Sequence, residues 1–131
     1  MVAAELEQVV REVVQSAPAE VMAIYLYGSR ARGEPKATSD VDLGVLLREA
    51  PTPRLGGVAP DLESAVEKSV HFAVDAVVMN TAPADLVHRI LRDGILLLDR
   101  DPAARIRFEV QARNEYFDLE PIRRLYRRLP R

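Results

Sequence analysis

The chain has 131 residues, of which 48% are hydrophobic, so it can bury one core and is too short for two ordinary domains. It contains no cysteine, which excludes disulfides and thiolate metal sites and fits a reducing compartment. The formal net charge of −2 argues neither for nor against a nucleic-acid partner.

Hydrophobic periodicity and turn residues predict elements in the order helix, strand, strand, helix, strand, helix, strand, helix. Helices are expected over residues 4–16, after an N-cap at Asp61, from residue 81 or 82, and after an N-cap at Asp101. Strands are expected over residues 21–27, 41–47, 71–79 and 95–98. This order predicts a single α/β domain spanning residues 1–131, in which a small mixed sheet is backed by helices.

Three segments carry irregular or charged sequence. Residues 48–60 are rich in proline and glycine and predict a surface loop, and a further loop is expected over residues 35–39. Asp118 and Pro121 predict a break in the last helix near residue 118. The basic C-terminal helix at 118–131 has five arginines against two acidic residues, a net +3, which leaves −5 on residues 1–117. It fits either an acidic or phosphate-bearing partner or a solvated helix face.

Asp40 and Asp42 stand at the start of the second strand. In an extended strand, residues two apart point to the same face, so both carboxylates should lie together while Val41, Leu43 and Val45 face the core. Two anions this close repel unless a cation lies between them, and oxygen ligands suit Mg²⁺. The pair predicts a metal site, although an isolated Asp-x-Asp is more often turn chemistry.

Gly28 and Ser29 end the first strand. A glycine permits a tight turn and a close approach to a ligand, and the amides of the following turn attract anions, so a phosphate would fit beside the metal. Arg30 and Arg32 follow, where each guanidinium either reaches a triphosphate or is simply solvated.

Asp75 interrupts an apolar strand. An ionised carboxylate there is costly unless it is paired or metal-bound, or unless it lies at a sheet edge facing water. The two histidines have no metal-ligand spacing; His71 is expected to be structural and His88 to lie on the surface.

The combination of Gly28-Ser29, ten residues and Asp40-x-Asp42 resembles the signature of the DNA polymerase beta-like nucleotidyltransferase superfamily. Within it, Gly-Ser-Arg-Ala-Arg-Gly-Glu at 28–34 and Ser-Asp-Val-Asp-Leu at 39–43 are similar to minimal nucleotidyltransferases, the small proteins paired with HEPN toxins. Val-Asp-Ala-Val-Val-Met-Asn at 74–80 is similar to the third-aspartate strand of that family, although Val78 replaces a residue that is often acidic. The resemblance covers roughly residues 20–120 and implies the polymerase beta-like fold.

The resemblance also implies an activity. A Mg²⁺-dependent nucleotidyltransferase of this kind acts as an antitoxin by transferring AMP from ATP to a tyrosine of a HEPN ribonuclease toxin. Asp40, Asp42 and Asp75 would be the catalytic residues and the ligands of two Mg²⁺ ions. Gly28 and Ser29 would bind the β- and γ-phosphates of the nucleotide, with Arg30 and Arg32 near them.

Two other functions stay open. The chain could neutralise a partner by forming a complex without catalysis, or it could be a small-molecule nucleotidyltransferase resembling the aminoglycoside-modifying enzymes and working as a homodimer. We expect a HEPN-type protein partner in a hetero-oligomer and no direct nucleic-acid binding. No signal peptide or membrane-length apolar run is seen, so a cytoplasmic protein without membrane contact is expected. The base preference is not predicted.

Overall fold

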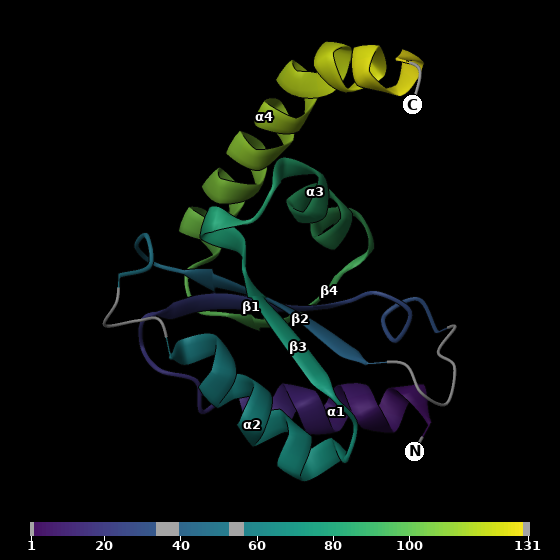
Figure 1. The fold of residues 1–131 in the computed structure, drawn as a ribbon. Coiled ribbons are helices and arrows are strands. Elements are labelled where there is room, and N and C mark those ends of the chain that lie inside the picture. The colour runs from purple at the N-terminus through teal and green to yellow at the C-terminus, as the bar shows by residue number, and fades with distance from the viewer. Residues whose placement is uncertain (1, 34–39, 53–56, 130–131) are drawn as a thin grey trace.

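The computed structural model describes residues 2–33, 40–52 and 57–129, and a four-stranded sheet with helices on both faces dominates it (Figure 1). The loop expected over residues 35–39, part of the loop expected over residues 48–60, and Arg131 of the basic C-terminal helix lie outside these ranges. Within these ranges, no helix combines the length and the apolar character that a membrane span requires.

The sheet is mixed, as the sequence predicts. Its strands are β1 (Val21–Tyr27), β2 (Val41–Leu47), β3 (Val74–Val78) and β4 (Ile95–Asp99), in the order β3-β2-β1-β4. The central strand β1 pairs antiparallel with both β2 and β4, whereas β2 pairs parallel with β3. The C-terminal end of β1 therefore lies at the same edge of the sheet as the N-terminal ends of β2 and β3.

One face of the sheet is covered by α1 (Ala3–Val14) and α2 (Val58–Val70), which lie side by side below it in Figure 1. Their buried residues recur at three- and four-residue spacing, as a helix that covers a core requires. They pack with the inward residues of β2 in one cluster that includes Leu6, Val10, Val14, Leu62, Val66, Val70, Val41, Leu43 and Val45. The predicted core side of β2 is confirmed.

The other face of the sheet is buried too. The 3-10 helix η2 (Met79–Thr81), α3 (Ala84–Asp93) and α4 (Pro102–Arg128) follow β3 and β4, and α3 and α4 lie above the sheet in Figure 1. Gly44 of β2 allows α3 to approach closely, since a Cβ built on Gly44 would lie 3.1 Å from both Ile90 Cγ2 and Met79 Sδ. Both faces of β2 are therefore apolar, which explains its nearly continuous hydrophobic sequence.

Several predicted boundaries are wrong. The helix expected after Asp61 begins at Val58 with Gly57 as its N-cap, so the preceding loop is shorter than expected. The third strand is shorter at both ends, because His71 ends α2 in a left-handed conformation with φ 60° and because Met79 starts η2. By contrast, the predicted cap at Asp101 is confirmed, since its side chain accepts a hydrogen bond from the amide of Ala104.

The predicted helix break near residue 118 is also wrong, because α4 continues from Pro102 to Arg128 with Pro121 inside it. A proline lacks the N–H for one helical hydrogen bond and crowds the preceding turn, which bends a helix without necessarily ending it. Figure 1 shows the corresponding change of direction in the last part of α4. The basic segment is therefore the bent end of a longer helix.

A polar network ties the first part of α4 to the sheet. The hydroxyl of Tyr25 on β1 donates to Glu109 Oε1 at 2.6 Å, and Arg105 Nη1 donates to the same oxygen at 3.0 Å. Arg105 Nε also lies 3.0 Å from Asp99 Oδ2 of β4. Burial, followed by the hydrogen bond to Glu109, raises the pKa of Tyr25, so this phenol stays a donor. The network fixes α4 across β1 and β4.

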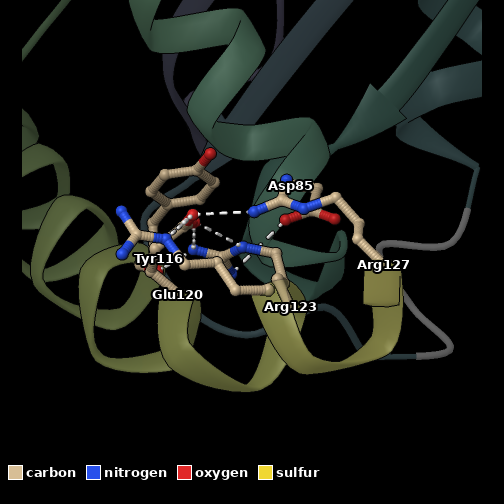
Figure 2. Close-up of polar contacts among 6 residues, drawn as sticks. Asp85, Tyr116, Glu120, Arg123 and Arg127 are labelled. Atoms are coloured by element: carbon tan, nitrogen blue, oxygen red, sulfur yellow. Dashed lines mark hydrogen bonds and ion pairs between the residues drawn. The ribbon is translucent and has the colours of Figure 1, made fainter. Parts of the chain in front are cut away.

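A second network holds the bent end of α4 against α3 (Figure 2). The guanidinium of Arg123 lies 3.8 Å from the ring centroid of Tyr116, and its nitrogens lie 3.4 Å from Asp85 Oδ1 and 3.1 Å from Glu120 Oε2. The ring of Tyr116 also stacks on His88 of α3, with centroids 3.7 Å apart. His88, expected simply at the surface, instead joins the two helices.

Candidate functional site

Three polar side chains meet at the edge of the sheet where β1 ends. Tyr27 of β1 is the register partner of Asp42 on β2, and Asp42 is the register partner of Asp75 on β3. Burial raises the pKa of Asp42 and of Tyr27, and the negative charge of Asp75 raises both further. The structure thus brings Asp75 beside Asp42, although the two are far apart in sequence.

The electrostatics of this corner are unfavourable without a cation. Burial and then the charges of Asp75 and Asp40 raise the pKa of Asp42, while Arg32 acts in the opposite direction. Burial, Asp42 and Asp75 raise the pKa of Tyr27 to about 12, against the effect of Arg89. Both shifts have the same two causes, burial first and the neighbouring carboxylates second.

The chemistry of the donors fits a hard divalent cation. Carboxylate oxygens are the ligands that Mg²⁺ prefers, and a bound cation would relieve the repulsion that raises the pKa of Asp42. Asp40 and Asp75 are exposed and Asp42 is half-buried. Across the ranges that the structure describes, however, no three His, Asp or Glu side chains are grouped closely enough to hold a metal. The assignment of the three aspartates as ligands therefore remains a prediction.

The turn after β1 approaches the same corner. Gly28 has φ 76°, and its carbonyl accepts hydrogen bonds of 3.2 Å from the amides of Ala31 and Arg32. A Cβ on Gly28 would collide with Asp42 Oδ2. Only glycine combines this positive φ with this close approach, so the turn and the carboxylate of Asp42 can lie side by side.

A pocket of about 320 Å³ opens between this turn and α3. It is of the size at which small-ligand sites begin. The residues that line it come from the end of β1, the following turn, β2 and α3: Tyr27, Gly28, Ser29, Arg32, Asp42, Arg89, Arg92 and Asp93. Its three arginines and two aspartates give the lining a net charge of +1. Such a lining suits an anionic ligand.

The two arginines predicted near the phosphates have different surroundings. Arg32 lines the pocket, as the prediction requires. The guanidinium of Arg30 instead lies 4.2 Å from the ring centroid of Phe72, between α2 and β3, and Arg30 is not part of the pocket lining. The structure therefore brings Arg32, and not Arg30, to the candidate phosphate site.

Sequence reasoning missed four residues of this pocket: Tyr27, Arg89, Arg92 and Asp93. The charged residues lie on the polar side of an amphipathic helix, where solvated side chains are the ordinary expectation. No local pattern distinguishes them, because the packing of α3 against the sheet places them over the Gly28 turn. For Tyr27, the sequence did contain an indication, since Tyr27 immediately precedes the Gly-Ser turn.

Comparison with known proteins agrees with the fold. The sequence matches the family model described as "Polymerase beta, Nucleotidyltransferase" over residues 8–103. No curated protein matches it.

Among solved structures, the chain is similar to one from a toxin–antitoxin complex with AMP-PNP, with 21% identity, coverage of 92% of this chain and 94% of the other, and a TM-score of 0.75. A chain from the complex of tri-AMPylated HEPN toxin with MNT antitoxin from Shewanella oneidensis has 18% identity, coverage of 95% and 94%, and a TM-score of 0.71. A candidate minimal nucleotidyltransferase has 27% identity, coverage of 72% and 95%, and a TM-score of 0.56.

Proposed function

This chain belongs to the polymerase beta nucleotidyltransferase family, and we propose that it is an antitoxin that transfers AMP from ATP to a partner protein. The acceptor is a tyrosine of a HEPN ribonuclease toxin, and the reaction depends on Mg²⁺. The support for the antitoxin role is the similarity in fold to chains from toxin–antitoxin complexes, one with AMP-PNP and one with an AMPylated toxin.

One observation carries the proposed chemistry: Asp42 and Asp75 are register partners beside the pocket formed by the Gly28 turn. Nucleotidyl transfer needs little covalent chemistry from a protein, because positioning and charge stabilisation supply most of the catalysis. The bond between the α-phosphorus and its bridging oxygen breaks, a bond to the acceptor oxygen forms, and pyrophosphate leaves. The site must therefore orient a polyphosphate and a hydroxyl on opposite sides of one phosphorus.

The residues divide between these tasks. The turn amides at Gly28 and Ser29, with Arg32, bind the β- and γ-phosphates and hold the nucleotide in the pocket. Asp75 is exposed and therefore accessible to an acceptor, whose hydroxyl proton it receives. Mg²⁺ held by Asp40, Asp42 and Asp75 would supply charge neutralisation for the attacking and leaving oxygens.

The exposure of the site favours a large acceptor. Asp40 and Asp75 are exposed, so a side chain that projects from the surface of another protein can reach them. Within the residues that the structure describes, no separate domain covers the pocket. The partner has to bring its own binding surface.

Transfer is tested with ATP labelled at the α-phosphate, Mg²⁺ and a HEPN-type protein as the acceptor. We expect label on a tyrosine of that protein, and no label with the Asp42→Asn variant. Asp118→Asn, which removes an exposed carboxylate of α4, is the matched control and should keep full activity. Label on small hydroxyl compounds and never on protein would contradict the proposal and favour the aminoglycoside-type alternative.

The same variants separate catalysis from simple complex formation. The ribonuclease activity of the toxin is measured with each variant present in excess. If Asp42→Asn neutralises the toxin as fully as the unmodified chain does, the antitoxin acts by binding and the proposed enzymatic role is wrong.

A further inference from the structure

The α3 side of the pocket carries two arginines to which the proposed function assigns no role. Arg89 and Arg92 are three residues apart, so they lie on one face of α3, and both line the pocket. The opposite face of α3 is held in the core by Val87 and Ile90, which are 4% and 0% exposed. This wall of the pocket is therefore carried on a rigid element.

The charges on this wall are arranged for an anion. Asp93 also lines the pocket, but both of its carboxylate oxygens accept hydrogen bonds from Arg92, at 3.0 Å and 2.9 Å. This bidentate contact neutralises Asp93 and fixes the guanidinium of Arg92. The positive charge of Arg89 acts against the rise in the pKa of Tyr27, which lies beside Asp42.

The position of the arginines matters because α3 ends at this place. The last carbonyls of a helix carry partial negative charge, which disfavours a phosphate, whereas the turn on the other wall offers amides. The positive charges of arginines in the last turns offset the partial negative charge of these carbonyls. The pocket then presents positive groups from two sides, Arg32 with the Gly28 turn on one wall and Arg89 with Arg92 on the other.

We propose that Arg89, supported by Arg92, forms the second half of a polyphosphate subsite that clamps at least two linked phosphates against the Gly28 turn. The role of this subsite in holding the β- and γ-phosphates, and the pyrophosphate that leaves, rests on the proposed function. Its binding chemistry does not. The pocket should bind inorganic tripolyphosphate more tightly than pyrophosphate, and pyrophosphate more tightly than phosphate.

Calorimetry with inorganic tripolyphosphate, in Mg²⁺ and again in EDTA, tests the subsite without any turnover. We expect Arg89→Ala to weaken binding about tenfold or more, because a charge-assisted contact to phosphate is lost, and Arg89→Lys to recover part of it. Arg107→Ala is the matched control, an exposed arginine of α4 outside the pocket lining, and should bind normally.

Asp93→Asn distinguishes a binding role from a structural one. A basic residue in a last turn also stabilises a helix through its dipole, which would be the only role of Arg92 if α3 bound nothing. We expect Asp93→Asn to bind tripolyphosphate more tightly than the unmodified chain, since a negative charge leaves the pocket. Weaker binding by Asp93→Asn, or unchanged binding by Arg89→Ala at an unchanged melting temperature, would overturn the proposal.

The outcomes separate this subsite from the proposed function. Tripolyphosphate binding that depends on Arg89, together with no transfer of AMP to protein, would leave the subsite standing and refute the function. Transfer of AMP to protein, together with tripolyphosphate binding that does not change in Arg89→Ala, would support the function and refute the subsite. If the unmodified chain binds no tripolyphosphate in either buffer, the subsite does not exist.

Discussion

Gly28 lies against the carboxylate of Asp42 so closely that no side chain fits between them. This contact joins the turn after β1 to the start of β2, and it couples the two parts of the sequence motif in space. The turn and the carboxylate can share one pocket only while position 28 is glycine.

Gly28→Ala is therefore expected to displace Asp42 as well as strain the turn. Gly33→Ala is the matched control, because Gly33 has a similar φ of 72° but no atom of the described residues lies within 4 Å of a Cβ built there. Both variants should lose about 1 kcal/mol of stability from the left-handed conformation, and Gly28→Ala more. Only Gly28→Ala should also lose ATP binding, measured by calorimetry. Equal effects of the two substitutions would show that the contact with Asp42 is unimportant.

Asp42→Asn should stabilise the metal-free protein at neutral pH. The pKa of Asp42 in the folded protein is raised by burial and by Asp75 and Asp40 above its ordinary value of 3.8, so the folded state binds this proton more readily than the unfolded state. Protonated Asp42 therefore favours the folded state. This contribution to stability is fully present below the ordinary pKa of aspartate and is lost as the pH rises through the raised pKa of Asp42 in the folded protein. We expect a higher melting temperature for Asp42→Asn in EDTA at pH 7.

The difference between Asp42→Asn and the unmodified chain should shrink as the pH is lowered towards 4, since the aspartate then becomes neutral as well. Added Mg²⁺ should raise the melting temperature of the unmodified chain more than that of the variant. Asp118→Asn, away from this cluster on α4, should show neither effect. A lower melting temperature of Asp42→Asn in EDTA at pH 7 would mean that the carboxylate is satisfied without a cation.

Asp75→Asn and Asp40→Asn should have different consequences for the proposed reaction. Loss of a proton acceptor typically costs about 10²–10⁴ in rate, so Asp75→Asn should lower AMP transfer by this order with little change in ATP affinity. Asp40→Asn should instead weaken Mg²⁺-dependent ATP binding. Rates of labelled transfer and calorimetry check the two effects, and equal losses in both measurements for Asp75→Asn would contradict the division of roles.

Arg123→Ala should loosen the bent end of α4 without affecting the pocket. The variant loses the contact with the ring of Tyr116 and the ion pairs with Asp85 and Glu120 (Figure 2). We expect amide hydrogen exchange after residue 116 to become about tenfold faster, the equivalent of roughly 1.4 kcal/mol. ATP binding should not change.

Arg128→Ala is the control for this helix, because it removes an exposed arginine at the end of α4. Its exchange rates should match those of the unmodified chain at residues 116–123. If Arg123→Ala leaves the exchange rates after residue 116 unchanged, the direction of α4 is set by Pro121 alone.

Local sequence was sufficient for the bounds of two strands, β1 and β2. β1 and β2 have the predicted bounds, because Gly28 directly follows the apolar run of β1 and Asp40 directly precedes β2. The mixed sheet followed from the order of the elements. Helix boundaries were less accurate, since α2 starts without a side-chain cap and η2 has no distinct pattern.

Tertiary structure alone decided which side chains meet. Asp75 is adjacent to Asp42 because β3 pairs parallel with β2 in one register, and a strand shifted by one residue would have turned Asp75 to the other face. Arg89 and Arg92 reach the pocket because α3 packs onto Gly44, whereas the guanidinium of Arg30 lies over the ring of Phe72. The amino-acid sequence determined which chemical groups are available at the sheet edge. The packing of α3 determined which charged residues face that edge. The sequence does not predict this packing, because long-range contacts leave no local periodicity.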